Sequence, residues 1–113
     1  MLSRKYRLAR NKDFARVSQQ GKAIFGREIS LKWTKNNLSY SRFGIVVSLK
    51  VDKKANVRNK IKRRIRAALK EYLVQLVQGY DFLILTRAEI KELDYSQIKD
   101  RMLKYFQKGK LIK

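Results

Sequence analysis

The sequence predicts an α+β fold in which helices pack on one small sheet, and three observations support this prediction. Short apolar segments, rich in β-branched and aromatic residues, have the length of strands. In the segments between them, apolar residues recur at steps of three and four, as on one face of a helix. The resulting order is α-β-β-(β)-α-β-α, typical of helices laid on a sheet. A chain of 113 residues suits one modest core, so we expect a single domain over residues 1–113.

The first predicted helix is short. Asn11 is a candidate N-cap and Gly21 is a candidate stop. Between them, Phe14, Ala15 and Val17 supply apolar contacts. We therefore expect this helix to bury one narrow side.

Two strands are predicted next, and a third follows much later. Over residues 27–33, apolar and polar residues alternate, which is the pattern of a half-buried strand. A turn at 35–37 follows, and residues 38–41 could add one short strand. Residues 43–47 and 80–86 are nearly all apolar, as expected of interior strands.

A long helix is predicted from about residue 53 to residue 77, between the two interior strands. Asp52 is its candidate N-cap and Gly79 its candidate stop. Together with the flanking strands it forms a βαβ unit, for which the general rule predicts a right-handed crossover. A final helix begins after Asp94, because Asp94 and Gln97 have the spacing of a capping box.

The polar side of the long helix is strongly basic. Residues 50–70 contain ten Lys and Arg against one acid, Asp52. A run of charge is ordinarily a solvated face, but solvated faces mix both signs, and uncompensated cations repel one another. We therefore predict contact with a nucleic acid. At about 100° per residue, a band of about 140° beside and opposite the apolar face holds Arg58, Asn59, Lys62, Arg63, Arg66 and Lys70.

The whole composition agrees with a polyanionic partner and disfavours catalysis by the chain. The formal net charge is +20, from 29 Lys and Arg against nine Asp and Glu. There is no His and no Cys, so the commonest general base and metal ligand and the strongest nucleophile are missing. The closest acids, Glu89, Glu92 and Asp94, fit a loop and a helix start better than a metal site. Apolar runs are only of strand length, so we expect a cytoplasmic protein with no membrane partner.

At Arg58-Asn59-Lys60-Ile61-Lys62-Arg63 the chain resembles the protein subunit of bacterial ribonuclease P. The resemblance covers essentially the whole chain. Its other matching segments are an aromatic-bearing helix ending in Gly (8–21), Gly44-Ile45-Val46-Val47-Ser48, Ala55 before the Arg-Asn motif, Lys62-Arg63-x-x-Arg66, and the strand from Asp81-Phe82 to Thr86-Arg87.

This resemblance implies a role in a ribonucleoprotein that removes the 5′ leader of precursor tRNA. The catalytic metal, Mg²⁺, would lie on a large RNA, and the protein would bind the leader and support that RNA. It implies no cofactor on the protein, no small-molecule substrate and a left-handed βαβ crossover, against the general rule.

The resemblance also implies two RNA-binding surfaces. The residues implied for docking on the catalytic RNA are Arg58, Asn59, Lys60, Lys62, Arg63 and Arg66. The residues implied for the leader cleft are Phe14, Ser48, Lys50 and Arg87. A core position remains an alternative for Phe14, and a solvated strand-end charge remains one for Lys50 and Arg87.

The chain departs from the family pattern in three places. Ser18 stands where many members carry a second aromatic residue, for which Phe25 or Trp33 could compensate. Leu49 replaces one of two lysines after the serine. The turn over 51–54 lacks a common glycine.

Three other functions stay open at this point. A structural RNA binder of the ribosomal-protein kind fits the charge and size equally well, and only the ordered motifs distinguish it. A DNA-binding domain would need a turn-helix partner for the basic helix. A protein-only nuclease would need the missing His, Cys or paired acids.

Overall fold

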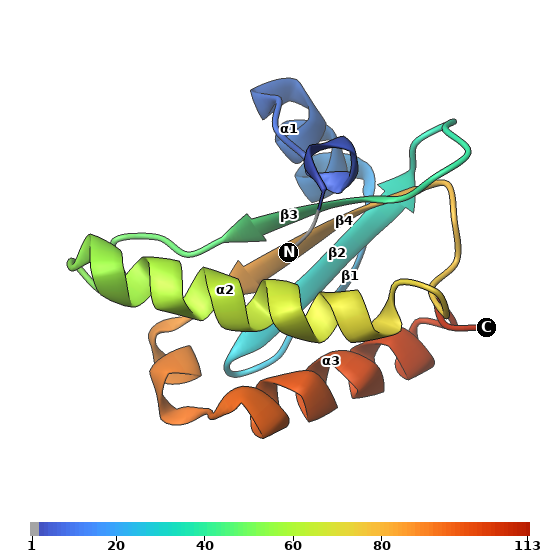
Figure 1. Ribbon diagram of the computed structural model, residues 1–113. Coiled ribbons are helices and arrows are strands. Elements are labelled where there is room, and N and C mark those ends of the chain that lie inside the picture. Colours follow the sequence, from blue (N-terminus) through green and yellow to red (C-terminus); the bar gives the residue numbers. More distant parts are fainter. Residues whose placement is uncertain (1–2) are drawn as a thin grey trace.

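The computed structural model describes residues 3–113 and contains a four-stranded sheet with helices on both faces (Figure 1). In chain order the elements are η1 (Arg4–Tyr6), α1 (Asn11–Gln20), β1 (Lys22–Ile24), β2 (Ile29–Lys35), β3 (Arg42–Val46), α2 (Ala55–Tyr72), β4 (Tyr80–Thr86), η2 (Ala88–Glu92) and α3 (Tyr95–Lys108). The predicted α+β class is confirmed.

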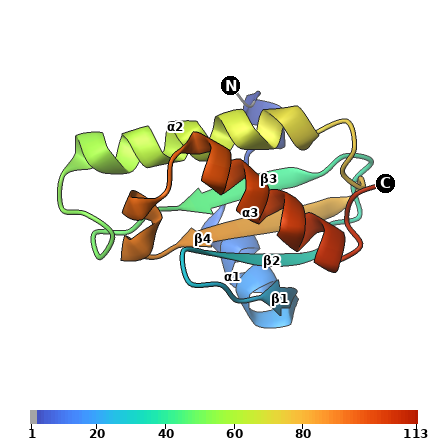
Figure 2. The same ribbon diagram turned by 90° about the horizontal axis from the view of Figure 1, so that it is seen from below.

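The sheet has the order β1-β2-β4-β3, with β2 antiparallel to both neighbours and β3 parallel to β4. Helix α2 connects the parallel pair. Seen from the α2 side with both strands pointing up, β4 lies to the left of β3, so the crossover is left-handed (Figures 1 and 2). The general right-handed rule is therefore wrong here, and the expectation drawn from the resemblance is confirmed.

Two apolar layers lie on opposite faces of the sheet. Helices α2 and α3 cover one face and α1 part of the other (Figure 2). Strand β4 contributes to both: Phe82 and Ile84 pack toward α2 and α3, whereas Leu83 and Leu85 pack toward α1. Burial on both faces explains why this strand is a continuous apolar run instead of an alternating one.

The extra short strand is β1, which precedes β2 in the chain and forms one edge of the sheet. Its predicted position at 38–41 was therefore wrong. Strand β1 directly follows Gly21 and pairs with residues 31–33 of β2. Residues 36–41 instead form a loop, in which Asn36 Oδ1 accepts a hydrogen bond from the Leu38 N–H and Asn37 adopts a φ of 62°. Such local side-chain bonding competes with strand pairing.

Two predicted helix starts were also wrong. Asn11 is the first helical residue, and the extended residue before it, Arg10, is the N-cap. Helix α2 has Lys54 as its N-cap, because the Asp52 carboxylate accepts the Lys54 N–H at 2.8 Å in the turn before the helix. By contrast, the capping box of α3 at Asp94 and Gln97 is confirmed.

Helix α2 ends at Tyr72, five residues before the predicted end. The N–H groups of Gln75 and Leu76 both donate to the Tyr72 carbonyl, which closes a turn. Leu76 then forms a β-bridge with Ile112. This contact with the far end of the chain stops a helix whose apolar periodicity continues.

Candidate nucleic-acid interface

The outer side of α2 presents the cations that the sequence placed there. Ile61, Ile65 and Leu69 are buried against the sheet and α3, which directs the polar residues outward. Three predicted RNA-docking residues are exposed: Asn59, Lys60 and Arg63. The other three are half-buried: Arg58, Lys62 and Arg66.

In the described part of the chain, these cations have no acidic partners. Within residues 3–113, no lysine or arginine of α2 forms an ion pair with a carboxylate. The one acid of this helix, Glu71, lies in its last turn and pairs with Lys99 of α3 at 3.0 Å. The electrostatic field of this face is therefore uniformly positive, which suits the phosphates of a nucleic acid.

Arg58 also holds the turn that precedes α2. Its Nη1 donates to the carbonyls of Asp52 at 2.9 Å and Lys53 at 2.8 Å. The pKa of Asp52 is lowered mainly by the hydrogen bond that its carboxylate accepts from the Lys54 N–H, and further by the one from Lys91. In the described residues, positive φ occurs only at Asn37, Gly79 and Lys110. The turn over 51–54 therefore forms without a glycine.

Phe14 lies where α1 meets strand β3. A Cβ on Gly44 would lie 2.7 Å from Phe14 Cε1, so the ring rests directly on the glycine backbone. The ring is only half-buried and lines a shallow pocket of about 100 Å³ together with Arg66 of α2. The ring packs on the sheet, and its half-buried position beside the pocket leaves part of it reachable from solvent.

The other three cleft residues gather at one end of the sheet. Strands β3 and β4 are parallel neighbours, and Thr86 Oγ1 donates to the Val46 carbonyl at 2.8 Å where they end. Ser48 and Lys50 follow β3 and Arg87 follows β4, and all three are exposed. At about 3.3 Å per residue, Ser48 lies roughly 13 Å along the strand from Gly44 and Phe14. Between them and Phe14, Val46 and Leu85 lie on the α1 face of the sheet and are only half-buried, so a strip of the sheet beside α1 remains partly open.

A buried ion cluster fixes α1 over the sheet, and the sequence reasoning missed it. Asp81 of β4 is fully buried and accepts hydrogen bonds from Arg16 of α1, Arg42 of β3 and Asn36. Its bond to Arg42, as the largest cause, raises the pKa of that guanidinium. One signal was available: Asp81 is a lone acid in an otherwise apolar strand.

The two aromatic residues that could compensate for Ser18 differ in position. Trp33 is buried on the α3 side of the sheet and cannot reach the cleft. Phe25 is exposed, with Lys32 Nζ 5.9 Å from its ring centroid. The same ammonium donates to Ser18 Oγ at 3.2 Å.

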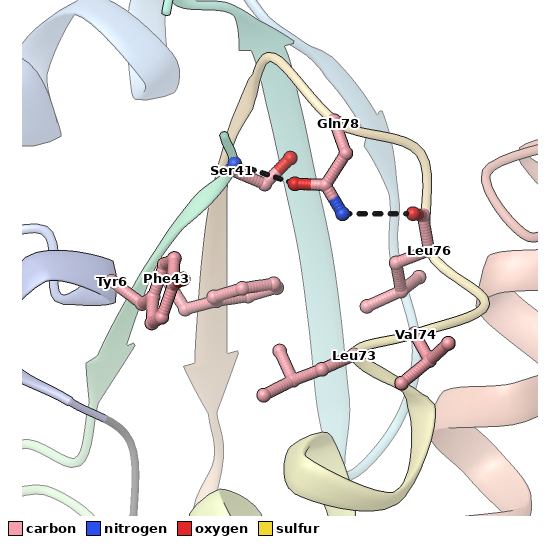
Figure 3. A pocket seen from close by; sticks show the side chains of 7 residues that line it. All are labelled: Tyr6, Ser41, Phe43, Leu73, Val74, Leu76 and Gln78. Atoms are coloured by element: carbon pink, nitrogen blue, oxygen red, sulfur yellow. Dashed lines mark hydrogen bonds between the residues drawn. The ribbon is translucent and has the colours of Figure 1, made fainter. Parts of the chain in front are cut away.

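A separate apolar pocket of about 180 Å³ lies between η1, β3 and the end of α2. Figure 3 shows Gln78 hydrogen-bonded to Ser41 and Leu76 at its rim. None of the predicted site residues lines it. No group of three or more His, Cys, Asp or Glu that could hold a metal occurs in the described part of the chain, and no helix there is long and apolar enough to cross a membrane.

A family model for ribonuclease P matches residues 2–110. The chain belongs to the ribonuclease P protein family. The ribonuclease P protein component of Pseudanabaena is 35% identical over 113 residues, covering 99% of this chain and 97% of that protein.

Solved structures agree with this assignment. The Staphylococcus aureus RNase P protein has a TM-score of 0.87 at 28% identity, covering 96% of this chain and 98% of that one. A mutant of the S. aureus protein with defective mRNA degradation activity has a TM-score of 0.88 at 28% identity, covering 96% and 91%. Membership supports a role in tRNA 5′ processing with a ribonuclease P RNA, and the ribosomal-protein-like alternative is not favoured.

Proposed function

We propose that the chain docks on ribonuclease P RNA through the outer face of α2 and binds the 5′ leader of precursor tRNA in the strip beside α1. The unpaired cations of α2 carry this proposal. A protein with net charge +20 repels itself wherever cations are left without acids, and an RNA backbone relieves that repulsion. The residues proposed for docking are Arg58, Asn59, Lys60, Lys62, Arg63 and Arg66.

The leader cleft offers the two contacts that a single strand needs. The reachable side of Phe14 provides a surface for a stacked base, which is tolerant of sequence. Lys50 and Arg87 provide charge for phosphates at the end of the strip, and Ser48 adds a hydroxyl. Unpaired bases of a leader can stack in this way, whereas the paired bases inside a tRNA stem cannot.

Catalysis, in this proposal, belongs to the RNA subunit and its Mg²⁺, and the protein is a non-catalytic subunit that holds no metal or cofactor of its own. The side-chain inventory supports this division, since the chain has no His or Cys to activate a water or a nucleophile. We place the assembly in the cytoplasm and assign it no small-molecule substrate.

Reconstitution tests the division of labour. Cognate ribonuclease P RNA should cleave precursor tRNA at low magnesium faster with the protein than without it. The protein alone should leave precursor tRNA uncut at every magnesium concentration. A single-stranded mRNA belongs in the same assay, given the activity described for the S. aureus protein. If the protein cleaves the substrate in the absence of the catalytic RNA, at a rate proportional to protein concentration, the non-catalytic assignment is wrong.

The docking face is tested by salt dependence. A plot of log affinity for the RNA against log salt has a negative slope. Replacing Lys62 and Arg63 with Ala should make this slope shallower by about 0.9 per lost duplex contact. The matched control removes the same charge from α3, at the exposed residues Lys104 and Lys108. Circular dichroism should remain helical for both variants. Equal slopes for variant and control would show that α2 faces solvent.

The leader cleft is tested with Phe14→Ala. Loss of a stacked base is worth about 1–3 kcal/mol, whereas mature tRNA has no leader and should bind as before. Because Phe14 also packs on Gly44, a melting curve accompanies each affinity. A lowered melting temperature with an unchanged precursor-to-mature affinity ratio would mean that Phe14 only packs.

A further inference from the structure

Phe25 is the one exposed aromatic residue in residues 3–113, with 69% of its surface accessible. The other aromatic side chains of this range are buried or half-buried. This phenyl ring therefore does not contribute to the hydrophobic core. A single exposed apolar residue needs no explanation by itself, but the surroundings of this ring point to a ligand.

The loop that carries Phe25 is firmly placed. A Cβ on the next residue, Gly26, would lie 1.8 Å from the Tyr105 hydroxyl of α3 and 2.4 Å from the Ile29 carbonyl. The Gly26 N–H also donates to Ser30 Oγ at 3.3 Å. The backbone is thus pressed against α3, and the Phe25 ring projects from a fixed position.

The ring lies on the α1 side of the sheet. Lys32 of β2 pairs with Leu83 of β4, whose side chain packs toward α1, and directly paired residues share a face. Lys32 Nζ lies 5.9 Å from the Phe25 ring centroid. It also donates to the Ser18 carbonyl at 3.4 Å and to Ser18 Oγ at 3.2 Å. The ammonium therefore lies between α1 and the ring.

Phe14 and Ser18 are one helical turn apart on α1, so they share one side of that helix. The sequence of groups along the cleft is then an aromatic ring, a hydroxyl, a cation and a second aromatic ring. Binding sites for single-stranded nucleic acids combine aromatic platforms with cations in this way.

We propose that Phe25 and Lys32 form a second nucleotide-binding position in the leader cleft. A leader base stacks on the Phe25 ring, and Lys32 neutralises the adjoining phosphate. Phe25, reaching in from the β1–β2 loop, supplies the aromatic surface that Ser18 does not. This inference rests on the proposed binding of the leader by the strip beside α1.

Phe25→Ala tests the position, with Val74→Ala as the matched control because Val74 is an exposed apolar residue just beyond the C-terminal end of α2. Loss of the base stack should weaken binding of precursor tRNA with a long leader by about five- to hundredfold. Mature tRNA should bind as before. Melting temperature should not change, since the ring is exposed. An unchanged affinity for the long-leader substrate, or an equal loss for mature tRNA, would overturn the proposal.

A rescue variant separates stacking from any local disturbance. Adding Ser18→Phe to Phe25→Ala places an aromatic ring on α1 beside Lys32 and should restore the precursor-to-mature affinity ratio. If the double variant folds but binds precursor tRNA as weakly as Phe25→Ala does, the rings of residues 18 and 25 do not serve the same nucleotide-binding position. Lys32→Met should make the slope of log affinity against log salt shallower by about 0.7 for the long-leader substrate. An unchanged slope would show that Lys32 does not contact a leader phosphate.

The same titrations distinguish this inference from the proposed function. If Phe14→Ala lowers the precursor-to-mature ratio and Phe25→Ala does not, the second position is wrong and the leader cleft stands. If the unaltered protein shows no preference for precursor over mature tRNA, the leader cleft itself is wrong.

Discussion

Asp81→Asn should both destabilise the fold and weaken leader binding, because one carboxylate connects three elements. Asp81 Oδ1 accepts from Arg42 Nε and Asn36 Nδ2, both at 2.9 Å, and Oδ2 accepts from Arg42 Nη2 at 2.7 Å and from Arg16 Nη2. Asparagine has the same shape but one acceptor oxygen and no charge. The substitution therefore leaves two guanidinium groups facing an amide.

The size of the effect follows from burial. Breaking a buried ion pair from one side typically costs about 3–5 kcal/mol. Asp81 is fully buried, but the Arg16 and Arg42 side chains keep 29% and 22% of their surface, so they regain some hydration. We expect the lower end, about 3 kcal/mol. An unfolding entropy of about 2.1 cal/mol/K per residue over 113 residues converts this to a drop of about 13 °C in melting temperature.

The assay combines a melting curve with the precursor-to-mature affinity ratio, measured well below the melting temperature. Arg16 fixes α1 to Asp81 and to the Lys35 carbonyl at 2.9 Å, so a loosened α1 should misplace Phe14 and lower the ratio. The control is Glu28→Gln. Glu28 is another buried acid with two arginines, but its contacts are longer, 3.4 Å to Arg101 and 3.9 Å to Arg27, and it does not contact α1.

Glu28→Gln should therefore cost less stability and leave the affinity ratio unchanged. If Asp81→Asn melts like the unaltered protein, the cluster contributes no net stability. If it melts lower but keeps the full ratio, α1 does not depend on Asp81 for its position over the cleft.

Two further predictions concern the contact between Gly44 and Phe14 and the loss of folding stability at low pH. Gly44→Ala forces the Phe14 ring to move, since the new Cβ lies 2.7 Å from it; we expect a loss of about 1–3 kcal/mol in denaturant titration and a lower precursor-to-mature ratio, and a neutral result in both would contradict the close contact. Hydrogen bonds from Tyr95, first, and Lys99 lower the pKa of Glu71 below 4.5, so its contribution to stability is present above that pH and is lost as pH falls through the folded-state value. Urea midpoints of the unaltered protein and Glu71→Gln should differ at neutral pH and converge once the pH has fallen below the folded-state pKa of Glu71, whereas a constant difference would contradict the linkage.

The features that the sequence predicted correctly are those fixed by neighbouring residues. Strand β4 has its predicted bounds, Tyr80–Thr86, and the Asp94 capping box forms as expected. The basic side of α2 also faces outward as its periodicity indicates. In each case the decisive interactions lie within a few residues of one another, or depend only on separating apolar from polar side chains.

The features that escaped prediction depend on contacts between distant segments. Helix α2 stops at Tyr72 because Leu76 pairs with Ile112, and Asp81 is buried because Arg16 and Arg42 reach it from other elements. The three-residue strand β1 forms because β2 offers an edge to it. Handedness of the crossover is likewise a property of the whole sheet, and only resemblance to a family anticipated it.

The distribution of acids explains why the partner was easier to infer from the sequence than the cleft. The acids that pair with cations are Asp13, Glu28, Asp52, Glu71, Asp81 and Glu92. Most of these contacts join one structural element to another, so the acids stabilise packing and leave the outer face of α2 uncompensated. That imbalance is visible in composition alone. The proposed cleft, in contrast, combines Phe14, Phe25 and Lys32 from three separate segments, and no local pattern marks them as neighbours until the sheet has formed.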